Sequence, residues 1–275
     1  MLDNLIHRIN NYSGPFRITV HDVGHGNWNE IQFGDTRIFF DIGAQMGWGN
    51  LRVQQIINNV NIEPDDEIYI FLSHWDIDHY HSILQLEGTQ QLQQIRAFFA
   101  PSNEHKTATV NRVINILSSA GIPFYPIEFT NKRNRHNKEI ELNLEEYCLG
   151  RLKIYRSTKT PSKNLNSIVM HFETENNNVL FTGDQKYEKL YSYVVNHSNK
   201  NKPYIFILPH HGGYAGKFKK DDWETVNFSD IIISYHKRNR YGHPFQSHIT
   251  TANSLLKDSN TIIETNGTGS KFFVI

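Results

Sequence analysis

The sequence predicts an α/β fold, and two observations support this class. Short apolar runs bounded by Gly, Pro or Asp recur along the whole chain, as expected for strands buried in a sheet. Between them lie segments with apolar residues three and four positions apart, typical of amphipathic helices. Because no linker or low-complexity stretch divides the chain, we expect residues 1–275 to form a single domain with two βα layers.

The N-terminal half contains the elements expected of the first layer. Residues 16–20, 30–33 and 37–42 read as an antiparallel meander, because Gly34-Asp35 supplies a turn between the last two runs. Further predicted elements are a helix at 51–60, a strand at 68–72, a helix at 82–92, a strand at 95–100 and a helix at 106–120.

The C-terminal half repeats this character and predicts a second layer. We expect strands at 152–155, 167–172, 178–182, 204–208 and 230–235, helices at 185–196 and 247–257, and a final β pair made by 261–264 and 271–275.

Composition excludes several classes of protein. The 28 Lys and Arg residues balance 28 Asp and Glu residues, so attraction for a polyanion must come from local patches. The single cysteine, Cys148, excludes an internal disulfide and a multi-thiolate metal site. The first residues lack the long apolar core of a signal peptide or membrane span. We therefore expect a cytoplasmic protein without membrane insertion.

The most informative stretch is His74-Trp75-Asp76-Ile77-Asp78-His79, which follows the predicted strand at 68–72. Ligands usually bind at the carboxyl ends of the strands in an α/β sheet. Two imidazoles and two carboxylates gathered there are costly to bury unless a cation lies among them. The stretch therefore indicates a metal site.

Three later positions place a ligand-type residue after an apolar run. Asp184 follows 179–183, the pair His210-His211 follows 204–208, and His243 follows 231–235 and a basic loop. If these strands share a sheet, their polar ends can meet at one edge.

Together with Asp41-Ile42-Gly43, this order resembles the metallo-β-lactamase hydrolase superfamily. The five motifs of that superfamily are an early Asp, His-x-His-x-Asp-His, a lone His, Gly-Asp and a late His. The chain departs at the second motif, where Asp76 replaces the second His. The resemblance implies a four-layer αββα sandwich of two mixed β-sheets flanked by helices, and it covers about Phe16 to Ile275.

The variant motif points to one branch of this superfamily. It resembles the hydrolase domain of ComEC-type DNA-uptake proteins and their free-standing relatives. The motifs that carry this resemblance, besides 74–79, are Val23-Gly24-His25-Gly26, Asn166-Ser167, His210-His211-Gly212 and Tyr241-Gly242-His243-Pro244.

The resemblance implies two divalent ions. By position, His74 and Asp76 would hold one ion and Asp78 and His79 the other. Asp184 would bridge both, and His211, or alternatively its neighbour His210, would complete the second site. Asp41 would orient the His74 loop. With oxygen and imidazole ligands in equal number, the ions would be Zn²⁺ or Mn²⁺.

Other histidines leave part of this set open. The lone His of the third motif is missing, because Thr160-Pro161-Ser162 and Asn164 stand in its region. His105 could replace it if its loop folds back. We expect the remaining histidines, among them His25, not to be ligands.

The implied activity is that of a metal-dependent hydrolase, namely a phosphodiesterase or nuclease acting on nucleic acid or a nucleotide ester. A hydroxide shared by the two ions, with Asp78 in the catalytic set, would attack phosphorus. His243 or the non-ligand member of the His210-His211 pair would protonate the leaving group, and Tyr241 would hydrogen-bond the phosphate. We expect the substrate to be bound by Lys237, Arg238, Arg240, Asn166 and Ser167.

Other interpretations remain open at this point. His243 is nearly as well explained as a structural histidine, and the loop cations as solvated side chains. The same fold could hydrolyse a non-phosphate ester, thioester or lactam. The chain could also be a non-catalytic metal-binding module. The sequence predicts no particular protein partner.

Overall fold

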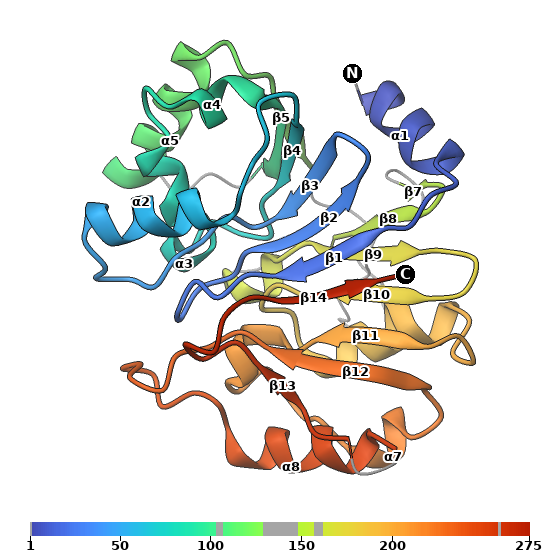
Figure 1. Cartoon of the computed structure of the whole chain (residues 1–275). Helices are drawn as coiled ribbons and strands as arrows, with labels where there is room; N and C mark the ends of the chain where they lie inside the picture. The colour runs from blue at the N-terminus through green and yellow to red at the C-terminus, as the bar shows by residue number, and fades with distance from the viewer. Residues whose placement is uncertain (1, 103–106, 129–147, 157–161, 258–259) are drawn as a thin grey trace.

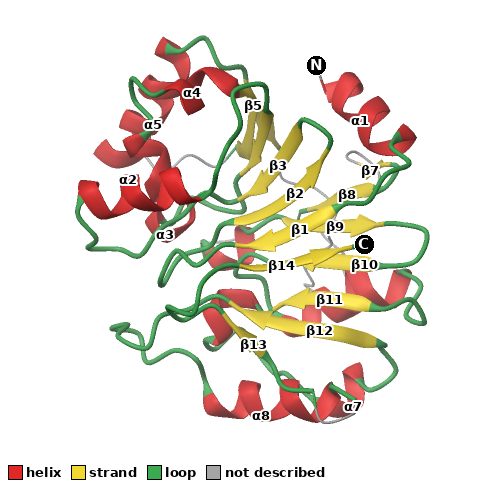
Figure 2. Ribbon diagram, viewed as in Figure 1, coloured by secondary structure: helices red, strands yellow, loops and turns green. Residues whose placement is uncertain are grey.

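The computed structural model describes residues 2–102, 107–128, 148–156, 162–257 and 260–275 (Figure 1). His105, Thr160 and Pro161 lie outside these residues. In the described part, two mixed β-sheets lie between layers of helices, with the strands inside and the helices outside (Figure 2). The predicted α/β class and its arrangement of two mixed sheets flanked by helices are confirmed.

The first sheet has the strand order β14-β1-β2-β3-β4-β5-β6. The predicted meander forms its antiparallel part, and β3 to β6 run parallel to one another. The strands are β1 (Arg17–Val20), β2 (Asn29–Phe33), β3 (Thr36–Phe40), β4 (Glu67–Phe71), β5 (Ile95–Pro101), β6 (Phe124–Ile127) and β14 (Lys271–Val274).

The second sheet has the order β13-β12-β11-β10-β9-β8-β7 and is parallel from β10 to β13. Its strands are β7 (Cys148–Leu149), β8 (Leu152–Tyr155), β9 (Val169–Glu173), β10 (Asn178–Phe181), β11 (Tyr204–Ile207), β12 (Phe228–Ile233) and β13 (Ile263–Glu264).

Helices cover the outer faces of both sheets (Figure 1). The α-helices are α1 (Leu2–Asn11), α2 (Asn50–Asn59), α3 (Ile77–Tyr80), α4 (Gln90–Gln94), α5 (Ala108–Ser119), α6 (Tyr187–Lys189), α7 (Lys220–Trp223) and α8 (Gln246–Leu255). Short segments of other helical type span 81–85, 164–166, 190–194, 195–197 and 209–212. No helix in the described ranges is long and apolar enough to cross a bilayer.

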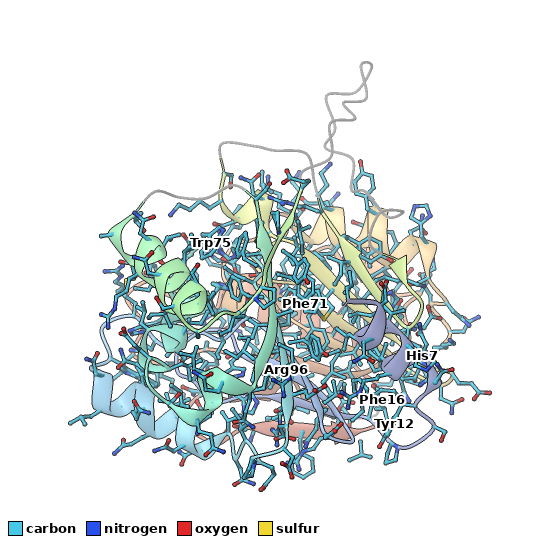
Figure 3. All side chains as sticks on the ribbon, turned by 90° about the horizontal axis from the view of Figure 1, so that it is seen from above. His7, Tyr12, Phe16, Phe71, Trp75 and Arg96 are labelled. Atoms are coloured by element: carbon cyan, nitrogen blue, oxygen red, sulfur yellow. The ribbon has the colours of Figure 1, made fainter. Side chains whose placement is uncertain are left out.

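Strand β4 shows why its sequence is a continuous apolar run. Tyr69 and Phe71 point into the core between the two sheets, whereas Ile68, Ile70 and Leu72 point into the core beneath the helices. Phe71 stacks on a neighbouring ring, with a centroid distance of 4.4 Å to Phe99 (Figure 3). A strand buried on both faces positions its carboxyl end rigidly.

Two predicted elements differ from the structure. The predicted helix at 82–92 is interrupted, because Gly88 has φ 75° and Thr89 then caps a new helix by accepting a hydrogen bond from Leu92 N at 3.3 Å. The predicted pairing of 261–264 with 271–275 is wrong. Strand β13 pairs with β12 and β14 pairs with β1, so the two segments belong to different sheets.

Candidate metal centre

The predicted ligands lie on loops that leave the carboxyl ends of sheet strands. The 73–79 segment follows β4, Asp184 follows β10, and His210-His211 follow β11. Loops after β1 and β3 add His25 and Asp41. The two sheets thus bring His25 and His211, which are 186 positions apart in the chain, to one edge of the sandwich, as the parallel parts of α/β sheets do.

Asp41 fixes the position of the ligand loop. It is fully buried and accepts hydrogen bonds from Ser73 N at 2.6 Å and Ser73 Oγ at 2.9 Å. Its Oδ2 also lies 2.7 Å from His79 Nδ1. Asp41 acts on His74 through Ser73, whose Oγ is 3.0 Å from His74 Nδ1. Asp41 therefore orients His79 directly and leaves His79 Nε2 free to face the site.

Two glycines allow this close packing. A Cβ at Gly43 would overlap the carbonyl oxygen of Asp78. This oxygen accepts a hydrogen bond from Asn27 N at 3.0 Å. Gly183 has φ 52°, and a Cβ there would lie 2.8 Å from Ser73 Cβ. The glycine of each motif thus lets one ligand loop lie against another.

The inner cluster consists of His74, His79 and Asp184, all buried. His74 Nε2 lies 3.6 Å from Asp184 Oδ2, and His79 Nε2 lies 3.4 Å from Asp184 Oδ1. The resemblance grouped His79 with Asp78 instead. In the structure the donor atoms of His79 converge with those of His74.

The outer cluster consists of His25, Asp78 and His211. His211 Nε2 lies 3.4 Å from Asp78 Oδ2, and His211 Nδ1 bonds to the carbonyl oxygen of Ser234 at 2.9 Å. The ring of His25 lies 4.3 Å from that of His211. We had not expected His25 among the ligand-type residues. The only sequence signal for it is its place between Gly24 and Gly26.

Both clusters fit a metal ion. His74 Nε2, His79 Nε2, His211 Nε2 and Asp184 Oδ1 are buried and have no hydrogen-bond partner in the part of the chain that the structure describes, although buried polar atoms nearly always have one. Ligands at tetrahedral angles, 2.0–2.1 Å from one ion, are about 3.4 Å apart, which is close to the spacings in both clusters. Imidazole and carboxylate donors suit Zn²⁺ and Mn²⁺.

The electrostatics of the inner cluster also favour a cation. Burial opposes charge on His79, but Asp41 and Asp184 outweigh it and hold the pKa of His79 well above its usual value. Burial opposes ionisation of Asp184, yet His210, His79 and His74 keep its pKa well below the usual range. In the absence of another cation, Asp41 and Asp184 therefore favour a proton on His79. A metal ion bound to His79 would replace this proton.

Asp76 belongs to neither cluster. Its Oδ2 lies 3.5 Å from His74 Nε2, and its Oδ1 accepts a hydrogen bond from Lys163 Nζ at 2.8 Å. Burial opposes ionisation, but His74 and Lys163 together lower the pKa of Asp76 to about 2. Lys163 lies in the region where the third motif lacks its His. Its neighbour Asn164 places Nδ2 2.8 Å from His210 Nδ1.

A pocket of about 210 Å³ opens onto both clusters. Besides cluster residues it is lined by Met46, Asp76, Ile77, His210, Tyr241 and His243. His210 Nδ1 lies 2.6 Å from Asp184 Oδ2, and although burial opposes it, Asp184 raises the pKa of His210. Burial and the neighbouring histidines lower the pKa of His243 to about 4. The pKa values of His210 and His243 are thus shifted in opposite directions.

The expected substrate-binding residues separate into two groups. Arg238, Arg240 and Tyr241 line an adjoining pocket of about 200 Å³, where Arg240 Nη2 donates to the Tyr241 hydroxyl at 2.8 Å. Asn166 and Ser167 are buried instead, and Ser167 Oγ accepts a hydrogen bond from Asp184 N at 3.4 Å. Lys237 lines neither pocket.

Trp75, inside the ligand loop, faces away from the pocket. It is buried, its Nε1 donates to the carbonyl oxygen of Pro101 at 3.0 Å, and its ring packs 6.0 Å from Phe98 (Figure 3). Trp75 therefore anchors the loop to β5.

Sequence comparison identifies no relative, since neither a protein-family model nor a curated protein matches the chain. Solved structures are similar in fold. The metallo-β-lactamase fold protein YhfI from Bacillus subtilis has a TM-score of 0.56 at 13% identity, over 95% of this chain and 100% of that one. The short form of human tRNase Z has a TM-score of 0.50 at 10% identity, over 81% of this chain and 93% of that one. The chain has the metallo-β-lactamase fold.

Proposed function

We propose that this chain is a metal-dependent hydrolase that cleaves phosphodiesters in nucleic acid or nucleotide substrates. The observation that carries the proposal is the set of buried imidazole and carboxylate atoms that have no partner among the described residues and that gather beside one pocket. Buried polar atoms without partners are costly, and their convergence on one site is best explained by a ligand that they bind.

We infer the metal ligands from the two clusters. His74, His79 and Asp184 would hold one ion, and His25, Asp78 and His211 the other. Asp76 Oδ2 can add to the first set. Bound ions would polarise a phosphoryl oxygen and activate water.

His210 is the better candidate for a proton donor. Asp184 raises the pKa of His210, which favours the protonated form that can donate to a leaving alkoxide, and His210 Nδ1 lies beside Asp184 Oδ2. His243 has a lowered pKa and is neutral at pH 7. We infer that His243 acts as a hydrogen-bonding or proton-accepting group.

The rim of the pocket supports a polyanionic, base-bearing substrate. Arg238 and Arg240 supply guanidinium groups, which bind phosphate well. Tyr241 is 45% exposed and lines both this pocket and the adjoining one. Exposed aromatic rings beside cations are the usual platform for unpaired bases. A structural relative is named a tRNase, and the resemblance to ComEC-type hydrolase domains indicates the same substrate class.

Turnover by protein of known metal content tests the proposal. The protein is stripped with chelator, reloaded with Mn²⁺ or Zn²⁺, and assayed on single-stranded DNA, RNA and bis-p-nitrophenyl phosphate. His79→Gln should abolish turnover, whereas His171→Gln should retain it, because His171 is equally buried but bonds to Asn178 within the second sheet.

Three other outcomes would contradict the proposal. Equal activity of the His79→Gln and wild-type proteins would exclude this centre as the catalytic site. Turnover of a lactam or thioester alone would favour the other hydrolytic chemistry. Metal binding without any turnover would favour a non-catalytic module.

A further inference from the structure

The side chain of Lys163 contacts Asp76, a carboxylate that would otherwise add to the metal affinity of the inner cluster. Its Nζ donates to Asp76 Oδ1 at 2.8 Å, while Asp76 Oδ2 lies 3.5 Å from His74 Nε2. Asp76 therefore divides its two oxygens between an ammonium group and the inner cluster. A divalent ion in the inner cluster would meet Lys163 as a competitor for the same carboxylate.

Backbone hydrogen bonds at and after Lys163 fix the position of this residue beside the ligand loop. The Lys163 carbonyl oxygen accepts a hydrogen bond from Asn166 N at 2.9 Å, which starts the short helix at 164–166. Ile168 N then donates to the carbonyl oxygen of Ser73 at 2.9 Å and joins the segment to the ligand loop. The side chains of Lys163 and Asp76 are 43% and 32% exposed, so the ion pair can open when a stronger cation arrives.

We propose that Lys163 competes with the ion of the inner cluster for the Asp76 carboxylate. The ion is therefore bound more weakly and exchanges with free metal. The inference rests on the metal centre assigned in the proposed function. The ammonium leaves Asp76 one oxygen for the ion instead of two, and it places a positive charge beside a divalent cation. The outer cluster has no lysine or arginine ion pair to its carboxylate among the described residues. Filling of the inner site, and with it activation, would then depend on metal concentration.

Calorimetric titration of chelator-stripped protein with Mn²⁺ tests this inference without any substrate. The wild type should show two binding classes. In Lys163→Met one class should tighten about tenfold, because a competing charge is removed, and the other should stay unchanged. Lys163→Arg keeps the charge and should retain the weaker class.

Further variants assign the affected class. Asp76→Asn should weaken the class that Lys163→Met tightens, and adding Lys163→Met to Asp76→Asn should tighten this class less than it does in the wild type, since the ion pair is already lost. Lys153→Met is the matched control. Lys153 Nζ bonds to Glu173 Oε2 at 2.7 Å on β8, so its removal breaks a comparable pair away from the centre.

The possible results separate this inference from the proposed function. Unchanged or weaker binding in Lys163→Met would overturn it, the latter by showing that Lys163 holds Asp76 in place for the ion. Absence of any metal binding would overturn both the metal centre and the inference. A selective tightening without phosphodiesterase activity would support the inference and overturn only the function.

Discussion

Two groups of buried side chains in this chain both combine histidine with carboxylates but differ in what neutralises the carboxylates. In the Arg37 network, formed by His21, Glu30, Arg37 and Asp66, Arg37 donates to Glu30 Oε1 at 2.7 Å, to Asp66 Oδ2 at 2.6 Å and to the Asn61 carbonyl oxygen at 2.9 Å. His21 Nε2 lies 2.8 Å from the other oxygen of Glu30. An internal cation therefore closes this network.

Among the described residues, the metal centre has no such internal closure. Its buried Nε2 atoms and Asp184 Oδ1 lack partners there, and the ammonium of Lys163 donates to Asp76 Oδ1, which lies outside both clusters. Buried charge by itself thus does not mark a functional site, because a structural network satisfies its own groups. The unpartnered atoms distinguish the two regions.

The largest expected effect is on activity, through Asp184→Asn. Asp184 lies against both His74 and His79, and its loss removes about 4 kcal/mol of transition-state stabilisation, or about a thousandfold in kcat/KM. The rise in unfolding temperature on adding Mn²⁺ should disappear as well. Retention of both would place the catalytic metal elsewhere.

The next effect concerns stability in the closed network. Arg37→Met leaves Glu30 and Asp66 buried without their cation, which should cost about 3–5 kcal/mol of unfolding free energy. Urea unfolding of metal-free and metal-loaded protein measures it, and the loss should be the same in both. A loss below about 1 kcal/mol would show that the network contributes little.

A smaller effect is expected for Asp41→Asn. Asn tolerates the φ of 63° at this position, so the substitution mainly removes the charge that orients His79. Metal affinity should fall about 10–100-fold, as for other residues that orient a ligand. Equilibrium dialysis against a metal buffer gives the ratio to wild type. An unchanged affinity would mean that Ser73 alone positions the loop.

The smallest expected effect is a difference between the two regions in how their contribution to stability depends on pH. The pKa of His79 is raised, so in metal-free protein its contribution to stability is present below about pH 6.5 and is lost as the pH rises through the folded pKa. The pKa of Glu30 is lowered because its bonds to His21 and Arg37 outweigh burial, so its contribution is present above about pH 4.5 and is lost in acid.

Thermal unfolding from about pH 6 to about pH 9 in chelator should therefore show a decline that His79→Gln lacks. Metal should remove the decline, since it replaces the proton on His79. The same decline in His79→Gln and in wild type would assign it to another group.

The sequence predicts those features that depend on local patterns. Each run of the 68–72 kind became a strand, and each ligand-type residue after such a run lies at the same edge of the sandwich. Features that depend on distant segments were missed. His25 joins Asp78 and His211 only because three loops meet, and the separation of 261–264 from 271–275 depends on which sheet each edge can reach. Asp76 matched a motif position, but no motif predicts its bond to Lys163.

The pairing of β14 with β1 has a consequence for synthesis on the ribosome. Residues 17–20 pair with 271–274, and Phe16 and Ile275 exchange two backbone hydrogen bonds of 2.9 Å. Strand β1 therefore keeps an unpaired edge until synthesis has reached residue 274. Exposed strand edges invite pairing with other chains. The nascent chain thus completes its first sheet only once β14 has been synthesised, and a chaperone could cover the edge of β1 until then.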